Sequence, residues 1–180
     1  MGDLIYTGIT SLDGYISDAS GNFDWSMPDE EVHSFINELE RPVATYLLGR
    51  RMFDVLKVWD TMPADPEHPA IDDYAQIWRA ADKIVYSTTL PEVTAPRTRL
   101  ERDFDPDAVR AIPGVISIGG AHLAAVAIRA GMIDEFRMLV SPIIVGGGTP
   151  YLPLGVTVPL TLVEHRRFGN GVVLLRYRRA

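Results

Sequence analysis

VISIGGAHLAAVAIRAG, residues 115–131, joins an apolar, strand-like run to a helical pattern through two adjacent glycines. Gly119 and Gly120 have no Cβ to block a ligand, and they tolerate backbone angles that turn successive N–H groups outward. A helix that begins near Ala121 adds unpaired amides and the positive end of its dipole. The stretch therefore predicts either an anion site or a tight turn whose glycines only let strand and helix pack closely.

The pattern on either side of this junction alternates between strand and helix. Leu123, Val126, Ala127 and Ala130 recur at helical spacing, and Gly131 supplies a stop signal. Strands are predicted at residues 4–10, 44–49, 83–87, 97–101, 114–118 and 134–141, and helices at 28–40, 52–58 and 74–81 with a helical turn at 105–112.

After residue 131 the pattern becomes antiparallel in style. The hairpin signal Asn170-Gly171 pairs a strand at 160–168 with one at 172–178. We therefore expect one α/β domain over residues 1–180, with a mixed, mostly parallel central sheet, an antiparallel C-terminal hairpin and helices on both faces.

Composition limits the class of protein. The chain has 180 residues, a formal net charge of −7 and no cysteine, which excludes disulfides and thiol chemistry. Residues 1–90 carry 6 basic and 16 acidic side chains (−10), whereas residues 91–180 carry 11 and 8 (+3). Nucleic acid is therefore not an expected partner. Four scattered histidines show no metal-ligand spacing, so we expect no bound metal. No segment resembles a signal peptide or a membrane span, so we expect a cytoplasmic protein.

Three strand-to-helix junctions carry groups that bind phosphate. In LLGRR at 47–51, a strand ends at a glycine that two arginines follow. In YSTTL at 86–90, a strand ends in three residues with hydroxyl side chains, and SIGGAH at 117–122 holds the glycine pair. In an open α/β sheet, ligands bind beyond the carboxyl ends of the strands, so these loops are expected to share one crevice. Helix amides, guanidinium groups and hydroxyls together suit a dinucleotide with a 2′-phosphate. Each junction also has a purely structural interpretation, as a surface arginine or a turn cap.

Two carboxylates are candidates for proton chemistry. Asp13 follows the first strand beside Gly14, where it either forms an Asx turn or reaches a substrate. Glu30 lies in the first turn of a helix after Trp25, where it either complements the helix dipole or relays a proton. The residues alone leave both alternatives open.

The order of these motifs resembles the dihydrofolate reductase-like superfamily, in the branch that includes the C-terminal reductase domain of bacterial riboflavin biosynthesis. The motifs are SLDGYI at 11–16, FDWSMPDE at 23–30, LLGRR at 47–51, VYSTTL at 85–90, SIGGAHL at 117–123 and SPIIVGGG at 141–148. The resemblance covers nearly the whole chain, and it implies that fold, NADPH as hydride donor and a homodimer.

The resemblance also assigns roles by position. Asp13 and Glu30 become the candidate catalytic residues, and Gly14 and Trp25 the candidate substrate contacts. The candidate cofactor contacts are Gly49, Arg50 and Arg51 for phosphates, Ser87 and Thr88 for the 2′-phosphate region, and Gly119, Gly120, Ala121 and Leu123 for the pyrophosphate.

Three departures leave the substrate open. Thr7 stands where the riboflavin-pathway reductases usually carry lysine, and Met52 stands where a threonine is usual. Arg79 is out of register with the arginine that holds the glutamate tail in folate reductases. We therefore expect an NADPH-dependent reductase of a small pterin-, pyrimidine- or ribitylamino-type heterocycle. The alternatives are an NADP(H)-binding module without turnover and a site for another phosphate ligand such as a flavin nucleotide.

Overall fold

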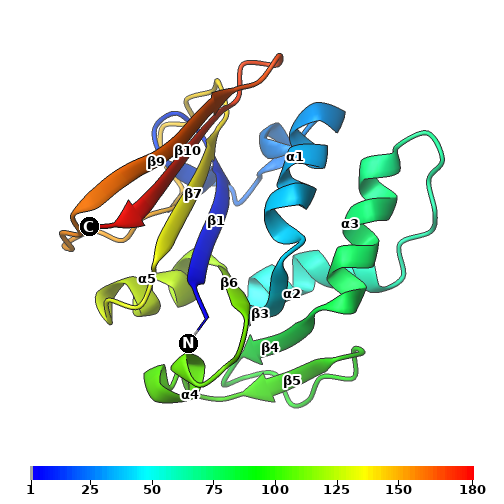
Figure 1. Cartoon of the computed structure of the whole chain (residues 1–180), viewed down its shortest axis with the longest axis vertical. Helices are drawn as coiled ribbons and strands as arrows, with labels where there is room; N and C mark the ends of the chain where they lie inside the picture. The colour runs from blue at the N-terminus through cyan, green and yellow to red at the C-terminus, as the bar shows by residue number, and fades with distance from the viewer. Residues whose placement is uncertain (1) are drawn as a thin grey trace.

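The structure, a computed structural model, describes residues 2–180 and is built on one eight-stranded sheet. The strand order is β5-β4-β3-β6-β1-β7-β10-β9 (Figure 1). The strands are β1 Leu4–Thr10, β3 Val43–Gly49, β4 Asp82–Tyr86, β5 Thr98–Glu101, β6 Val115–Gly119, β7 Glu135–Val140, β9 Leu160–Arg167 and β10 Val173–Arg179. A separate two-stranded sheet pairs β2, Tyr15–Ser17, with β8, Thr149–Pro150.

The mixed, mostly parallel sheet is confirmed, with one correction at its C-terminal side. β7 runs parallel to β1, so the antiparallel part begins one strand later than expected. β10 runs antiparallel to both β7 and β9, and the hairpin closes at the Asn170-Gly171 turn as predicted. Strand direction depends on how the chain crosses between strands, which residue alternation within a strand does not encode.

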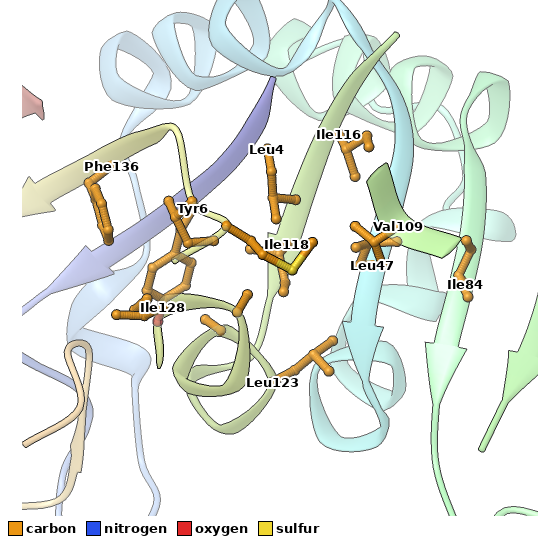
Figure 2. Packing of buried hydrophobic residues seen from close by; sticks show 14 of the residues in the cluster. Leu4, Tyr6, Leu47, Ile84, Val109, Ile116, Ile118, Leu123, Ile128 and Phe136 are labelled. Carbon is orange, nitrogen blue, oxygen red and sulfur yellow. The ribbon is translucent and has the colours of Figure 1, made fainter. Parts of the chain in front are cut away.

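Helices cover both faces of the sheet. They are α1 Glu30–Glu40, α2 Arg50–Leu56, α3 Pro69–Ala80, α4 Pro106–Arg110 and α5 Ala121–Arg129, with short 3-10 helices η1 at Asp24–Ser26 and η2 at Lys57–Asp60. α4 and α5 pack with β1, β3 and β6 in the largest apolar cluster, part of which Figure 2 shows. The helices α1, α2 and α3 pack on the other face in two smaller clusters. No helix within residues 2–180 is long and apolar enough to cross a bilayer.

The structure settles how two of the helices begin and which face they bury. Asp29 caps α1, because its Oδ1 accepts a hydrogen bond from the amide of Val32 at 2.9 Å. Val126 of α5 and Ala130, which follows the helix, are exposed, contrary to the expected stripe. The buried residues of α5 are Ala121, Leu123, Ala124, Ala127 and Ile128. Alanine is compatible with either face of a helix, so the apolar stripe of this alanine-rich segment was ambiguous by about one position.

A buried polar layer separates α1 from the middle of the sheet. Glu40 Oε1 accepts a hydrogen bond from Thr7 Oγ1 at 3.0 Å and lies 3.9 Å from Arg137 Nη1. Arg137 in turn pairs with Glu135 on the same strand, with 2.6 Å between Nε and Oε1. Burial raises the pKa of Glu40, and Arg137 and the Thr7 hydroxyl oppose that rise.

Candidate functional site

The three loops that carry candidate phosphate-binding groups lie side by side at the carboxyl ends of their strands. β4, β3 and β6 are neighbours and run parallel, so the loops at 86–90, 47–51 and 117–122 all leave the same edge (Figure 1). After β6 the chain enters α5 on one face of the sheet. After β1, the strand beside β6 in the sheet, the chain continues to α1 on the other face. Neighbouring strands whose connections diverge in this way open a crevice at their carboxyl ends.

Gly119 and Gly120 have different structural roles. A Cβ on Gly119 would lie 2.9 Å from Leu48 Cδ2 and 3.1 Å from Met52 Cγ, so this glycine permits close packing of two strands and α2. Gly120 has φ +96°, a conformation that residues with a side chain rarely adopt, and a Cβ there would lie 3.7 Å from the backbone nitrogen of Gly49. The packing interpretation therefore fits Gly119, whereas the anion site at Gly120 stays a prediction.

The two helices that start at this edge have no side-chain cap. Gly49 precedes α2 and Gly120 precedes α5, and neither helix receives a capping hydrogen bond from a side chain at that position. By contrast, Asp29 and Asp105 cap α1 and α4 with their carboxylates. First-turn amides that no side chain satisfies are suited to bind an anion. Ala121 and Leu123 bury their side chains, so they offer only backbone amides to such a ligand.

Arg50 connects the loops at 47–51 and 86–90. Its Nη1 donates a hydrogen bond to Thr89 Oγ1 at 2.8 Å, and its Nε lies 3.7 Å from Asp54 Oδ2. Arg51 is exposed. The structure thus places a guanidinium group between the end of β3 and the end of β4. Sequence reasoning missed Thr89, although it is the third hydroxyl of the YSTTL motif.

The loop after β4 is held in a fixed conformation. Ser87 is buried, and its Oγ accepts hydrogen bonds from the amides of Thr89 and Leu90 at 3.3 and 3.0 Å. Arg102 donates to the carbonyl oxygens of Ser87 at 2.8 Å and Pro91 at 3.1 Å. Thr88 is exposed at the surface. Ser87 therefore shapes the loop, and the exposed hydroxyls of Thr88 and Thr89 are the ones that a ligand can reach.

Asp13 connects the turn after β1 to the glycine-rich segment at 141–148. Its carboxylate accepts hydrogen bonds from the amides of Gly146 at 2.8 Å and Val145 at 3.2 Å. The hydroxyl of Ser11 and these amides hold the pKa of Asp13 below its usual value. The neighbouring Gly14 accepts a hydrogen bond from the Tyr151 amide. Asp13 is therefore an ionised carboxylate that also fixes this loop.

Glu30 faces the start of α3. The side chain is exposed, and its Oε1 accepts a hydrogen bond from the amide of Ala70 at 3.0 Å. Glu30 therefore satisfies a first-turn amide of a neighbouring helix, a tertiary contact that local sequence does not reveal.

A cavity of about 210 Å³ lies next to Trp25, at the carboxyl ends of β1 and β7. Ile9 of β1, Val32 of α1 and Val172 of the hairpin line it together with Trp25. The indole Nε1 of Trp25 is buried and has no hydrogen-bond partner within residues 2–180. Trp25 and Glu30 are thus both near the amino end of α1, but only Trp25 lines the cavity.

Two further features bear on which ligands the site can hold. Arg79 donates hydrogen bonds to the carbonyl oxygens of Trp59, Asp60 and Met62, so its guanidinium is already bonded to the backbone between α2 and α3. Residues 2–180 contain no group of three His, Asp or Glu side chains placed to bind a metal ion.

Comparison with known structures agrees with the dihydrofolate reductase-like fold. A putative riboflavin biosynthesis protein from Shewanella sp. PV-4 superposes with a TM-score of 0.75 at 22% identity, covering 100% of this chain and 99% of the other. Dihydrofolate reductase from Enterococcus faecalis, complexed with NADP(H), superposes with a TM-score of 0.66 at 16% identity, covering 99% and 96%. The fold class is therefore dihydrofolate reductase-like.

Sequence comparison points to one branch of this class. Residues 108–174 match the family described as the RibD C-terminal domain. The uncharacterized protein YyaP of Bacillus subtilis is 29% identical over 177 residues, covering 93% of this chain and 89% of that protein. A pyrimidine reductase-like protein from Corynebacterium diphtheriae has a TM-score of 0.70 at 16% identity, covering 99% and 92%. These matches confirm the resemblance to the riboflavin-biosynthesis reductase branch of the dihydrofolate reductase-like superfamily.

Proposed function

We propose that this protein is an NADPH-dependent reductase that transfers a hydride to a C=N or C=O bond of a small heterocycle of pterin, pyrimidine or ribitylamino type. The observation that carries the proposal is the alignment of two uncapped helix starts and the Arg50–Thr89 pair along one edge of the sheet. The structural relatives support it, since they include a 5-amino-6-(5-phosphoribosylamino)uracil reductase and a dihydrofolate reductase complexed with NADP(H).

The candidate residues fit NADPH. The amides of Ala121 and Leu123 after the Gly119-Gly120 turn would bind the pyrophosphate, because no side chain competes for them. Gly49, Arg50 and Arg51 would bind phosphate at the next loop, with Ser87, Thr88 and Thr89 beside the 2′-phosphate. The bound cofactor supplies the hydride, and the protein supplies position and charge.

On the substrate side, Asp13 and Glu30 have different roles. Asp13 is ionised and held by two amides, so it serves as a hydrogen-bond acceptor that orients the substrate near Gly14. Within residues 2–180, only Oε1 of Glu30 accepts a hydrogen bond, and we assign proton transfer to Oε2. Trp25 forms a wall against which the heterocycle lies.

The decisive experiment combines binding with turnover. NADPH is titrated by calorimetry, and its oxidation is then followed with a panel of pterins and aminopyrimidines. Tight NADPH binding with accelerated oxidation by one class of heterocycle is the expected result. Tight binding without acceleration by any member would instead support an NADP(H)-binding module. A yellow purified protein would indicate a flavin nucleotide.

We also propose that the protein is a homodimer in the cytoplasm. β9 is the last strand on one side of the sheet, so within residues 2–180 only one of its two edges is paired. Its side chains Leu160, Leu162 and Val163 are 38–48% exposed. An exposed apolar edge strand is a surface that a second copy can cover. Sedimentation equilibrium should give twice the chain mass, and Leu162→Arg should give the monomer.

A further inference from the structure

The cavity beside Trp25 is uncharged. Its walls come from β1, α1, the segment before α1, the end of β7 and the hairpin, and every residue that lines it within residues 2–180 is apolar or neutral. The polar members are Ser26, Ser141 and Asn170. Apolar walls with a few neutral polar groups suit a flat, uncharged ring. The volume of about 210 Å³ is below the ~300–1,000 Å³ of pockets for larger ligands, so the cavity holds a ring system and not a long tail.

The chain around this cavity is acidic. The segment that supplies Trp25 and continues into the first turn of α1 carries four exposed carboxylates, at Asp24, Asp29, Glu30 and Glu31. Clustered charges of one sign repel a ligand of the same sign, most strongly at low ionic strength. An anionic tail on the substrate would lie close to these carboxylates.

The arginines that flank α1 are already paired. Arg166 lies 4.6 Å from the ring centre of Phe35 and 3.9 Å from Glu31 Oε1. Arg41 pairs with Glu38 and Asp73. The guanidinium of Arg79 is bonded to three backbone carbonyls, as described above. Arg166 therefore offsets Glu31 alone, and within residues 2–180 no arginine forms an ion pair with Asp24, Asp29 or Glu30. Arg50 and Arg51 lie at the separate cofactor loops.

We infer that the cavity beside Trp25 binds the ring of the substrate and that this substrate is an uncharged heterocycle without a phosphate or carboxylate tail. The inference rests on the proposed function and narrows its substrate class. A substrate without a phosphate would distinguish this protein from a structural relative in Thermotoga maritima. That relative is a deaminase and 5-amino-6-(5-phosphoribosylamino)uracil reductase, and the compound in its name carries a phosphate.

A pair of compounds that differ only in the phosphate tests the inference. Calorimetry with saturating NADP⁺, which has no hydride to transfer, compares 5-amino-6-(5-phosphoribosylamino)uracil with its dephosphorylated form. We expect the dephosphorylated compound to bind about tenfold more tightly or better. Equal binding, tighter binding of the phosphorylated compound, or no binding of either would overturn the inference. NADPH affinity is measured separately, so loss of NADPH binding with retained ring binding would count against the proposed function alone.

Two variants with matched controls locate the effect. Asp24→Asn should strengthen binding of the phosphorylated compound by about threefold at low salt, leave the dephosphorylated one unchanged, and lose its effect at high salt. Asp107→Asn makes the same charge change on α4, away from α1 (Figure 1), and should do neither. Equal effects of the two substitutions would contradict a local acidic field.

Filling the cavity supplies an independent measurement. Val32→Met, at a buried position that lines the cavity, should weaken binding of the dephosphorylated compound by about tenfold with unchanged NADPH affinity. Val109→Met, at a similarly buried position on α4, controls for the general cost of overpacking. Unchanged ring binding by a folded Val32→Met protein would place the substrate elsewhere.

Discussion

The guanidinium of Arg50, at the start of α2, donates a hydrogen bond to the hydroxyl of Thr89, 2.8 Å away in the loop after β4. The two residues are far apart in the chain, yet β3 and β4 are neighbouring parallel strands, so their loops meet at one edge. This pair holds a cation beside two exposed hydroxyls, an arrangement suited to a phosphate monoester.

Replacing Arg50 tests the cofactor edge. Arg50→Met should weaken NADPH binding by about tenfold or more and reduce the preference for NADPH over NADH, because the guanidinium group proposed to pair with the 2′-phosphate is lost. The melting temperature should change little, since exposed ion pairs contribute about 0–1 kcal/mol. Arg110→Met is the control, since Arg110 is 47% exposed and paired, and Arg50 is 50% exposed. An unchanged ratio of NADPH to NADH affinity would remove Arg50 from the site.

Gly120 provides a second test. Gly120→Ala should cost about 1–2 kcal/mol of stability, because its φ of +96° is unfavourable for a residue with a Cβ, and it should abolish tight NADPH binding. Gly155→Ala is the matched control, with φ +75° and open space around the added carbon. Calorimetry and thermal unfolding of both variants separate backbone strain from loss of the site. Comparable NADPH affinities in the two variants would show that the Gly120 turn does not contact the cofactor.

Glu30 can be separated into its structural and chemical roles. Glu30→Gln retains an oxygen that can accept from the Ala70 amide, so the free energy of unfolding should change by less than about 0.5 kcal/mol. Turnover should fall about 100-fold, because an amide cannot exchange a proton. Glu31→Gln, one residue further along α1 and bonded to the Gly169 amide, should keep full turnover. Equal turnover in the two variants would leave Glu30 only its role at α3.

The buried carboxyl of Glu40 predicts a pH dependence of stability. Burial raises its pKa in the folded state above the ordinary 4.5, so the folded protein holds the proton more tightly than the unfolded chain. The stability from this group is therefore fully present below pH 4.5 and is lost as the pH rises through the folded-state pKa.

Two substitutions on α1 check this sign. Glu40→Gln should remove that part of the pH dependence, measured as urea unfolding free energies at acidic and neutral pH. Glu38→Gln is the control, because its carboxylate is 67% exposed on the same helix. A pH profile of Glu40→Gln that matches the wild type would show that folding does not shift the pKa of Glu40.

The elements that local pattern specifies were predicted well. Strand alternation and the Asn170-Gly171 signal located the hairpin, and apolar spacing located α1, whose half-buried Phe35, Ile36 and Leu39 face the core. The glycine, arginine and hydroxyl junctions were also found, because each motif lies within a few residues of a strand end. Local periodicity and turn chemistry carry this information without reference to the rest of the chain.

The tertiary structure decided what depends on distant contacts. The parallel direction of β7, the bond from Arg50 to Thr89, the anchoring of Ser87 by Arg102 and the contact of Glu30 with α3 each join segments far apart in sequence. Sequence by itself determined the helices, the strands and the three loops with candidate phosphate-binding groups, because these follow from residues next to one another. Only the tertiary structure decided which side chains meet and which charges are already paired, because partners are chosen when the helices pack on the sheet.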